Sequence, residues 1–106
     1  MNDAEHQDIT IENEGRVVAH AALNPTPNTE ILAAAMEVEH GHLPTGTRSR
    51  LVDAVVAEAA AQHGTYLQAS LPVGDAEMLH RLREHCPDLH ARAVGATCIA
   101  DGTLPH

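Results

Sequence analysis

The sequence predicts a small α/β domain, a two-layer α+β sandwich in which a mixed four-stranded sheet bears two helices on one face, in the order β-β-α-β-α-β. Three observations predict this fold class. Apolar side chains recur at helical spacing between Leu51 and Ala60. Residues 16–23 and 65–71 alternate between two faces, as half-buried strands do. A second helical stripe follows Asp75, so helices and strands alternate along the chain.

The chain has 106 residues, a length typical of one domain, and we place that domain at residues 15–101. Residues 1–14 are polar and acidic, which predicts a flexible acidic N-terminal tail, or at most a loosely attached edge strand, and residues 102–106 are predicted to form a frayed C-terminus. The apolar side chains are mostly small, because the chain has one Tyr and no Phe or Trp. Small side chains bury little area each, so we expect modest stability or a core completed by a partner chain.

The first predicted strand is residues 16–23, followed by a loop at residues 24–29, which contain two prolines. Residues 30–39 fit two interpretations. Asn28 as an N-cap and Gly41 as a terminator favour a helix. The alternation of apolar residues with glutamates favours a strand, which would form a hairpin with residues 16–23. We favour the strand and keep the helix as the alternative.

The first helix is predicted to start near Thr47, with Thr45 or Thr47 as its cap and Gly64 after its last turn. The strand that follows, residues 65–71, has one polar face. A parallel strand covered by helices on both sides would be apolar on both faces. We therefore place both helices on one face of the sheet and expect the other face to be open or covered by a second chain.

The second helix is predicted to begin at its cap, Asp75, and to end before Pro87. Residues 89–100 form the last predicted strand, with a bend at Gly95. Helical connections precede and follow residues 65–71. They predict that the last three strands are mutually parallel, with right-handed crossovers.

The net charge of −9 at pH 7 argues against whole classes of partner. All six basic residues are Arg, with no basic patch to bind DNA, RNA or an anionic membrane. Nine His permit a large change of charge between about pH 7 and pH 5, although we expect most of them to be ordinary surface residues. The N-terminus shows no export signal, so we expect a cytoplasmic protein, and the alanine-rich, lysine-free composition is typical of a high-GC bacterial genome.

Ligands of open α/β sheets bind outside the carboxyl ends of the parallel strands. At one such end, residues 44–48 open a helix and offer free N–H groups, the positive end of the helix dipole and a guanidinium to a phosphate or carboxylate. The candidate ligand-binding residues are Thr45, Gly46, Thr47, Arg48, Ser70, Gly74 and Asp75. His40 and His42 form one His-x-His pair in a loop, which is the candidate metal site.

Residues 43–71, LPTGTRSRLVDAVVAEAAAQHGTYLQASL, resemble the acyl-CoA-binding segment of the GCN5-related N-acetyltransferases. In that family a strand leads through a glycine-rich turn, Q/R-x-x-G-x-G/A, into a helix that carries the pyrophosphate, and then into another strand. Gly46 matches the first glycine, whereas Leu43 stands in place of Gln or Arg and Arg48 in place of the second small residue. The resemblance implies an acyl-CoA enzyme that uses Gly46, Thr47 and Arg48.

The main functional hypothesis is a small acidic binding or regulatory module that acts through protein–protein interaction, with no catalytic residue and no cofactor. Its partner would be another protein or a second copy in a homodimer, the commonest closed assembly. The open face of the sheet would carry the interaction, through Val18, His20, Tyr66, Gln68 and Ser70. The alternatives are a protein that binds a small anion such as a phosphate or acyl-CoA, a minimal acetyltransferase-like enzyme, and a histidine-based metal or pH sensor.

Overall fold

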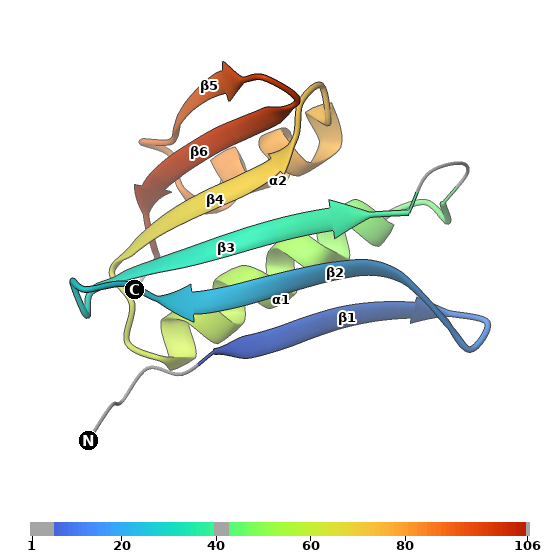
Figure 1. Cartoon of the computed structure of the whole chain (residues 1–106), viewed down its shortest axis with the longest axis horizontal. Coiled ribbons are helices and arrows are strands. Elements are labelled where there is room, and N and C mark those ends of the chain that lie inside the picture. Colours follow the sequence, from blue (N-terminus) through green and yellow to red (C-terminus); the bar gives the residue numbers. More distant parts are fainter. Residues whose placement is uncertain (1–5, 40–42, 106) are drawn as a thin grey trace.

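The computed structural model describes residues 6–39 and 43–105. In chain order the elements are β1 (Gln7–Asn13), β2 (Arg16–Pro25), β3 (Ile31–Val38), α1 (Thr47–Ala61), β4 (Tyr66–Pro72), α2 (Ala76–His85), β5 (His90–Val94) and β6 (Thr97–Thr103). The strands form one mixed sheet in the order β1-β2-β3-β4-β6-β5. Figure 1 shows both helices on the same face of this sheet, while no described element covers the other face.

The fold class is α/β, but the predicted four-stranded sheet is wrong, because the described residues form a six-stranded sheet. Two segments account for the difference. Residues 7–13, which we predicted to belong to a flexible tail, form β1. Residues 90–103 form two strands in place of the single one predicted at residues 89–100. The order of elements is therefore β-β-β-α-β-α-β-β.

β1 is held to the domain by its ladder with β2 and by one buried side chain. The two strands pair antiparallel along the whole of β1, and Ile11 is only 7% exposed. A register shift next to Ile11 leaves Val18 outside this ladder. Such a bulge can turn two consecutive side chains toward the same side, and here Val18 and Ala19 are both buried.

The C-terminal hairpin turns at Gly95, whose φ of 62° is a backbone conformation that favours glycine. β5 pairs antiparallel with β6 at the sheet edge, and β6 pairs antiparallel with β4. The prediction of three mutually parallel strands is therefore wrong for the last strand. The prediction is confirmed for β3 and β4, which are parallel.

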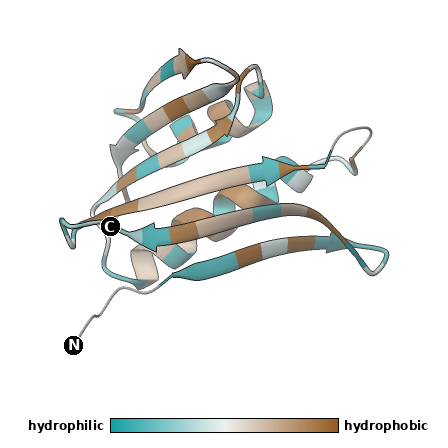
Figure 2. Cartoon of the chain, viewed as in Figure 1, coloured by the Kyte–Doolittle hydropathy of each residue, from teal (hydrophilic) through white to brown (hydrophobic). Residues whose placement is uncertain are grey.

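Residues 31–38 form β3, which confirms the strand interpretation of residues 30–39 and the hairpin with β2. Leu32, Ala34 and Met36 are at most 3% exposed, so one face of β3 belongs to the core. In Figure 2 most of β3 has the pale brown of weakly hydrophobic residues, because alanines occupy much of both faces.

α1 packs on the sheet through Leu51, Val52, Val55, Val56 and Ala59, which are at most 4% exposed. Its N-cap is Gly46, with φ of 86° and no side-chain capping bond, so neither Thr45 nor Thr47 caps the helix as predicted. Thr47 is buried, and its hydroxyl donates to the carbonyl of Pro44 at 2.8 Å.

The C-terminal end of α1 also differs from the prediction. His63, not Gly64, has the left-handed conformation, with φ of 64°. Gly64 is needed for another reason: a Cβ there would lie 2.7 Å from Cδ1 of the buried Leu32 and 3.1 Å from the carbonyl oxygen of Ala59. The residue at position 64, three residues after the end of α1, must therefore be small for the chain to pass close to Leu32 of β3.

α2 begins as the sequence predicts. The Oδ1 atom of Asp75 accepts a hydrogen bond from the backbone N–H of Met78 at 3.1 Å, which confirms Asp75 as the N-cap. Met78 and Leu82 are fully buried, and the helix ends at His85, two residues before Pro87. In the described part of the chain, neither helix has the length and apolar character that a bilayer span requires.

Candidate ligand-binding cleft

β3 and β4 lie side by side at their amino ends and separate toward their carboxyl ends. Their parallel ladder stops at the pair Ala35–Ser70, although β3 continues to Val38 and β4 continues to Pro72. The outer edges of both continuations stay paired, to β2 and to β6. Their inner edges therefore face one another with backbone groups that the β3–β4 ladder does not use.

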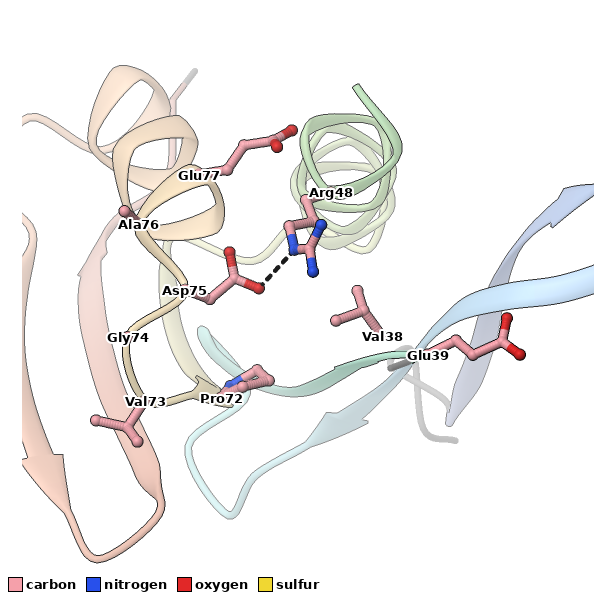
Figure 3. Close-up of a pocket in the computed structure, with 9 residues that line it drawn as sticks. All are labelled: Val38, Glu39, Arg48, Pro72, Val73, Gly74, Asp75, Ala76 and Glu77. Atoms are coloured by element: carbon pink, nitrogen blue, oxygen red, sulfur yellow. Dashed lines mark hydrogen bonds and ion pairs between the residues drawn. The ribbon is translucent and has the colours of Figure 1, made fainter. Parts of the chain in front are cut away.

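A cleft of about 450 Å³ lies at these carboxyl ends. It reaches from the end of β3 to the first turns of both helices, as Figure 3 shows. Its lining residues are Val38, Glu39, Arg48, Pro72, Val73, Gly74, Asp75, Ala76 and Glu77. This is the edge of the sheet at which open α/β folds bind ligands.

Arg48 and Asp75 connect two walls of the cleft. The Nε atom of Arg48, in the first turn of α1, donates to Oδ2 of Asp75 at 2.9 Å. The other oxygen of that carboxylate caps α2. The side chain of Asp75 is 6% exposed and that of Arg48 is 29% exposed, so the bond is shielded from water mainly on the carboxylate side. Figure 3 shows this ion pair between the two helix starts.

A second contact joins the same helix starts, and here the side chain comes from α2 and binds the start of α1. The Oε2 atom of Glu77 on α2 accepts from the backbone N–H and from the hydroxyl of Ser49 on α1, at 3.1 and 3.0 Å. Ser49 is the third residue of α1, so its N–H has no acceptor within the helix. The helix dipole favours a carboxylate at this place. Each helix thus provides a side chain to the start of the other.

The charge that faces the cleft is negative. The carboxylates of Asp75 and Glu77 oppose one guanidinium, that of Arg48, which leaves a net charge of −1 for these three lining groups. A third acid, Glu39, is turned away from Arg48 in Figure 3 and pairs with Arg16 at 2.9 Å through Oε1. Its Oε2 atom is buried and has no hydrogen-bond partner among the described residues.

The cleft brings together three of the predicted ligand-binding residues, Arg48, Gly74 and Asp75. Ser70 lies elsewhere, in a hollow on the open face of the sheet. The remaining three, Thr45, Gly46 and Thr47, are not among the lining residues. The candidate metal pair, His40 and His42, lies outside the described residues. Within residues 6–39 and 43–105, no group of three or more His, Cys, Asp or Glu is arranged to hold a metal ion.

Sequence reasoning missed Val38, Pro72 and Glu77. The rule that ligands bind at strand carboxyl ends was the available signal for Val38 and Pro72, which are the last residues of β3 and β4. No sequence pattern connects Glu77 with Ser49, because the two are 28 residues apart and meet only when the helices pack.

The open face of the sheet has its own hollow of about 440 Å³, lined mainly by β3, β4 and β6, with one residue each from β2 and β5. Gln68 and Ser70 of the predicted interaction face line it. His20 is on the same face, where its Nε2 atom lies 3.2 Å from Oδ1 of Asp8. Val18 is not part of this face, because the bulge in β2 buries it to 3% exposure.

Tyr66, the remaining residue of the predicted interaction face, is the first residue of β4 and so lies at the opposite end of the strand from the cleft. Its hydroxyl donates to Oδ2 of Asp101 at 2.6 Å, and this hydrogen bond raises the pKa of Tyr66 above its usual value. Because of its position, Tyr66 cannot exchange a proton with a group bound in the cleft.

The sequence matches no protein family and no curated protein. Solved structures match its fold. The ribosomal-protein-alanine N-acetyltransferase of Brucella melitensis is 16% identical, with a TM-score of 0.68 over 93% of this chain and 69% of that one. A GNAT-family acetyltransferase of Streptococcus pneumoniae is 11% identical, with a TM-score of 0.71 over 98% of this chain and 69% of that one.

A GNAT-superfamily phosphinothricin acetyltransferase of Sinorhizobium meliloti, solved with acetyl-CoA, is 10% identical, with a TM-score of 0.67 over 93% of this chain and 61% of that one. The chain has a GNAT-like fold. At these identities the similarity shows the fold alone. The chain spans 61–69% of the length of these three acetyltransferase structures. The similarity of fold covers 93–98% of this chain, residues 43–71 being one part of it.

Proposed function

We propose that this chain binds an acyl-CoA thioester in the cleft and presents the acyl group to an amine. The observation that carries the proposal is the end of the β3–β4 ladder at Ala35–Ser70, where two strand edges face one another across the cleft. The similarity to acetyltransferase structures, one of them solved with acetyl-CoA, supports the same ligand class.

The pantetheine arm of CoA fits such an opening chemically. It is a narrow extended chain with two amide groups, and an extended amide can pair with a strand edge as an added strand does. The inner edge of residues 36–38 offers backbone N–H and C=O groups to the opening, whereas on the β4 side Pro72 has no N–H and offers only its carbonyl oxygen. The nucleotide end of the ligand would then lie toward the start of α1, where Arg48 provides a guanidinium.

The reaction is acyl transfer. The amine nitrogen attacks the thioester carbonyl carbon, the new C–N bond forms, the C–S bond breaks, and the sulfur leaves as the thiol of CoA after a proton passes from the amine. The contribution that we assign to this chain is to hold the thioester in a fixed position. Positioning alone is a large part of the catalysis of a bimolecular step.

Calorimetric titration with acetyl-CoA tests this proposal. We expect a dissociation constant between about 1 μM and 1 mM, the usual range for enzyme substrates. Val38→Phe fills the cleft at the end of β3 and should weaken binding at least about tenfold, or about 1.4 kcal/mol. Val94→Phe is the matched control, because Val94 is 54% exposed on β5 and does not line the cleft. Circular dichroism shows whether both variants fold.

Equal binding by the two variants would place the ligand elsewhere and overturn the proposal. Absence of binding by the wild-type chain would favour a second candidate, a non-catalytic binding module with the same fold. The observation that favours this candidate is that the guanidinium facing the cleft, that of Arg48, is already paired with Asp75, while Tyr66 lies at the far end of β4.

A further inference from the structure

Glu77 lines the cleft, and its carboxylate is bound at the start of α1, where the positive end of the helix dipole favours an anion. Its carboxylate contacts both the N–H and the hydroxyl of Ser49 at the start of α1. Two other N–H groups at this helix start already have backbone acceptors: Thr47 donates to the carbonyl of Pro44, and Arg50 to that of Gly46. Of these three acceptors, Glu77 is the side chain and so the one that can move aside without unfolding the helix.

The local charges make it unfavourable for a phosphate to replace the Glu77 carboxylate at the start of α1. A phosphate oxygen and the Glu77 carboxylate have the same requirement, an N–H donor at the positive end of a helix dipole, and one N–H cannot satisfy both. The displaced carboxylate would stay nearby, because Glu77 is in the first turn of α2 beside Asp75. The nearby cation, Arg48, is held by Asp75 at 2.9 Å.

We propose that Glu77 is a specificity-determining residue: it competes with the phosphates of the donor for the start of α1 and so limits how tightly the cleft binds CoA. This inference rests on the proposed function. It states that Glu77 weakens the binding of the nucleotide end of the acyl-CoA. Glu77→Gln keeps a hydrogen-bond acceptor for Ser49 but removes the charge.

The test compares acetyl-CoA binding by wild type, Glu77→Gln and a control, Glu84→Gln. Glu84 is on the same helix and its loss changes the net charge equally, but it pairs with Arg81 away from the cleft. The interaction of a carboxylate with a helix N-terminus changes an equilibrium constant by about two- to fivefold. We expect Glu77→Gln to bind acetyl-CoA at least about twofold more tightly, with the difference shrinking as salt screens the charge.

The outcomes separate the two proposals. Unchanged affinity in Glu77→Gln, with acetyl-CoA still shifting the amide resonance of Val38, would overturn the role of Glu77 and leave the proposed function intact. A gain as large in Glu84→Gln would also overturn it, because net charge alone would explain the effect. Absence of binding by wild type and Glu77→Gln alike would overturn both proposals.

Discussion

The Nε atom of Arg48 lies 2.9 Å from Oδ2 of Asp75, and the other oxygen of this carboxylate caps α2. One buried carboxylate therefore fixes the start of α2 and the first turn of α1 relative to one another. Glu77 and Ser49 repeat the connection in the opposite direction. The walls of the cleft are thus set by contacts between helix starts, which lie at the strand ends where β3 and β4 separate.

Substitutions of Asp75 should separate its two roles. Asp75→Asn keeps an oxygen that can cap α2 but removes the ion pair with Arg48. Asp75→Ala removes both contacts and should cost about 1–2 kcal/mol for the cap alone. We expect chemical denaturation to show a clearly larger loss of unfolding free energy for Asp75→Ala than for Asp75→Asn. Equal losses would mean that the cap contributes nothing beyond the ion pair.

β1 should contribute measurably to stability although its sequence is polar. Ile11→Ala removes a buried side chain and should reduce the unfolding free energy by about 2–4 kcal/mol. Thr10→Ala changes an exposed neighbour on the same strand and should have little effect. If Ile11→Ala were as mild as Thr10→Ala, residues 7–13 would be the loose tail that the sequence suggests.

Gly64→Ala should destabilise the domain by about 1–3 kcal/mol, because the new Cβ would crowd Leu32 in the core. A double-mutant cycle with Leu32→Ala provides the check. Shortening Leu32 is costly by itself but makes room for the added methyl group, so the double variant should lose less than the sum of the single losses. Strict additivity would show that Gly64 is required for a reason other than its approach to Leu32.

The ion pair between Asp53 on α1 and Arg81 on α2 should make the unfolding free energy depend on pH in the acid range. Two hydrogen bonds from Arg81 hold the pKa of Asp53 down to about 2, against an ordinary value of 3.8. A lowered folded-state pKa stabilises the fold above about pH 4, and this contribution disappears as the pH falls toward 2. Because the Asp53 side chain is 40% exposed, water screens the pair and we expect less than about 1 kcal/mol.

The measurement is the difference in unfolding free energy between wild type and Asp53→Asn at pH 5 and near pH 2. This difference should be present at pH 5 and shrink at the lower pH. Glu12→Gln, which removes an exposed acid on β1, controls for the loss of one negative charge. A difference that grows as the pH falls would have the wrong sign for this explanation.

Strong periodic patterns predicted the centre of the fold, and weak ones failed at its two edges. The alternation in β3 and the helical stripe of α1 each mark a face that is buried in the core. β1 buries one side chain fully, Ile11, so its pattern looks like that of a polar tail. β5 is exposed at every position, and only Gly95 indicated that the chain reverses there.

Topology predicted the edge of the sheet at which the candidate cleft lies, whereas the contacts within the cleft could not be predicted. Placing ligands at strand carboxyl ends led to Arg48, Gly74 and Asp75, because β3 and β4 are parallel as expected. The pairing of Arg48 with Asp75 and of Glu77 with Ser49 depends on how α1 packs against α2. No local pattern in the sequence carries that information.

An amide NMR titration of the whole chain with acetyl-CoA shows directly whether the ligand binds between the carboxyl ends of β3 and β4. If acetyl-CoA binds in the cleft, the resonances of Met36, Glu37 and Val38 on β3, of Leu71 on β4 and of Val73 just after β4 shift together and saturate, while those of β1 and β5 stay in place. The absence of any shift at about 1 mM acetyl-CoA, the upper end of usual KM values, would show that the cleft does not bind this ligand. So would shifts confined to the open face of the sheet.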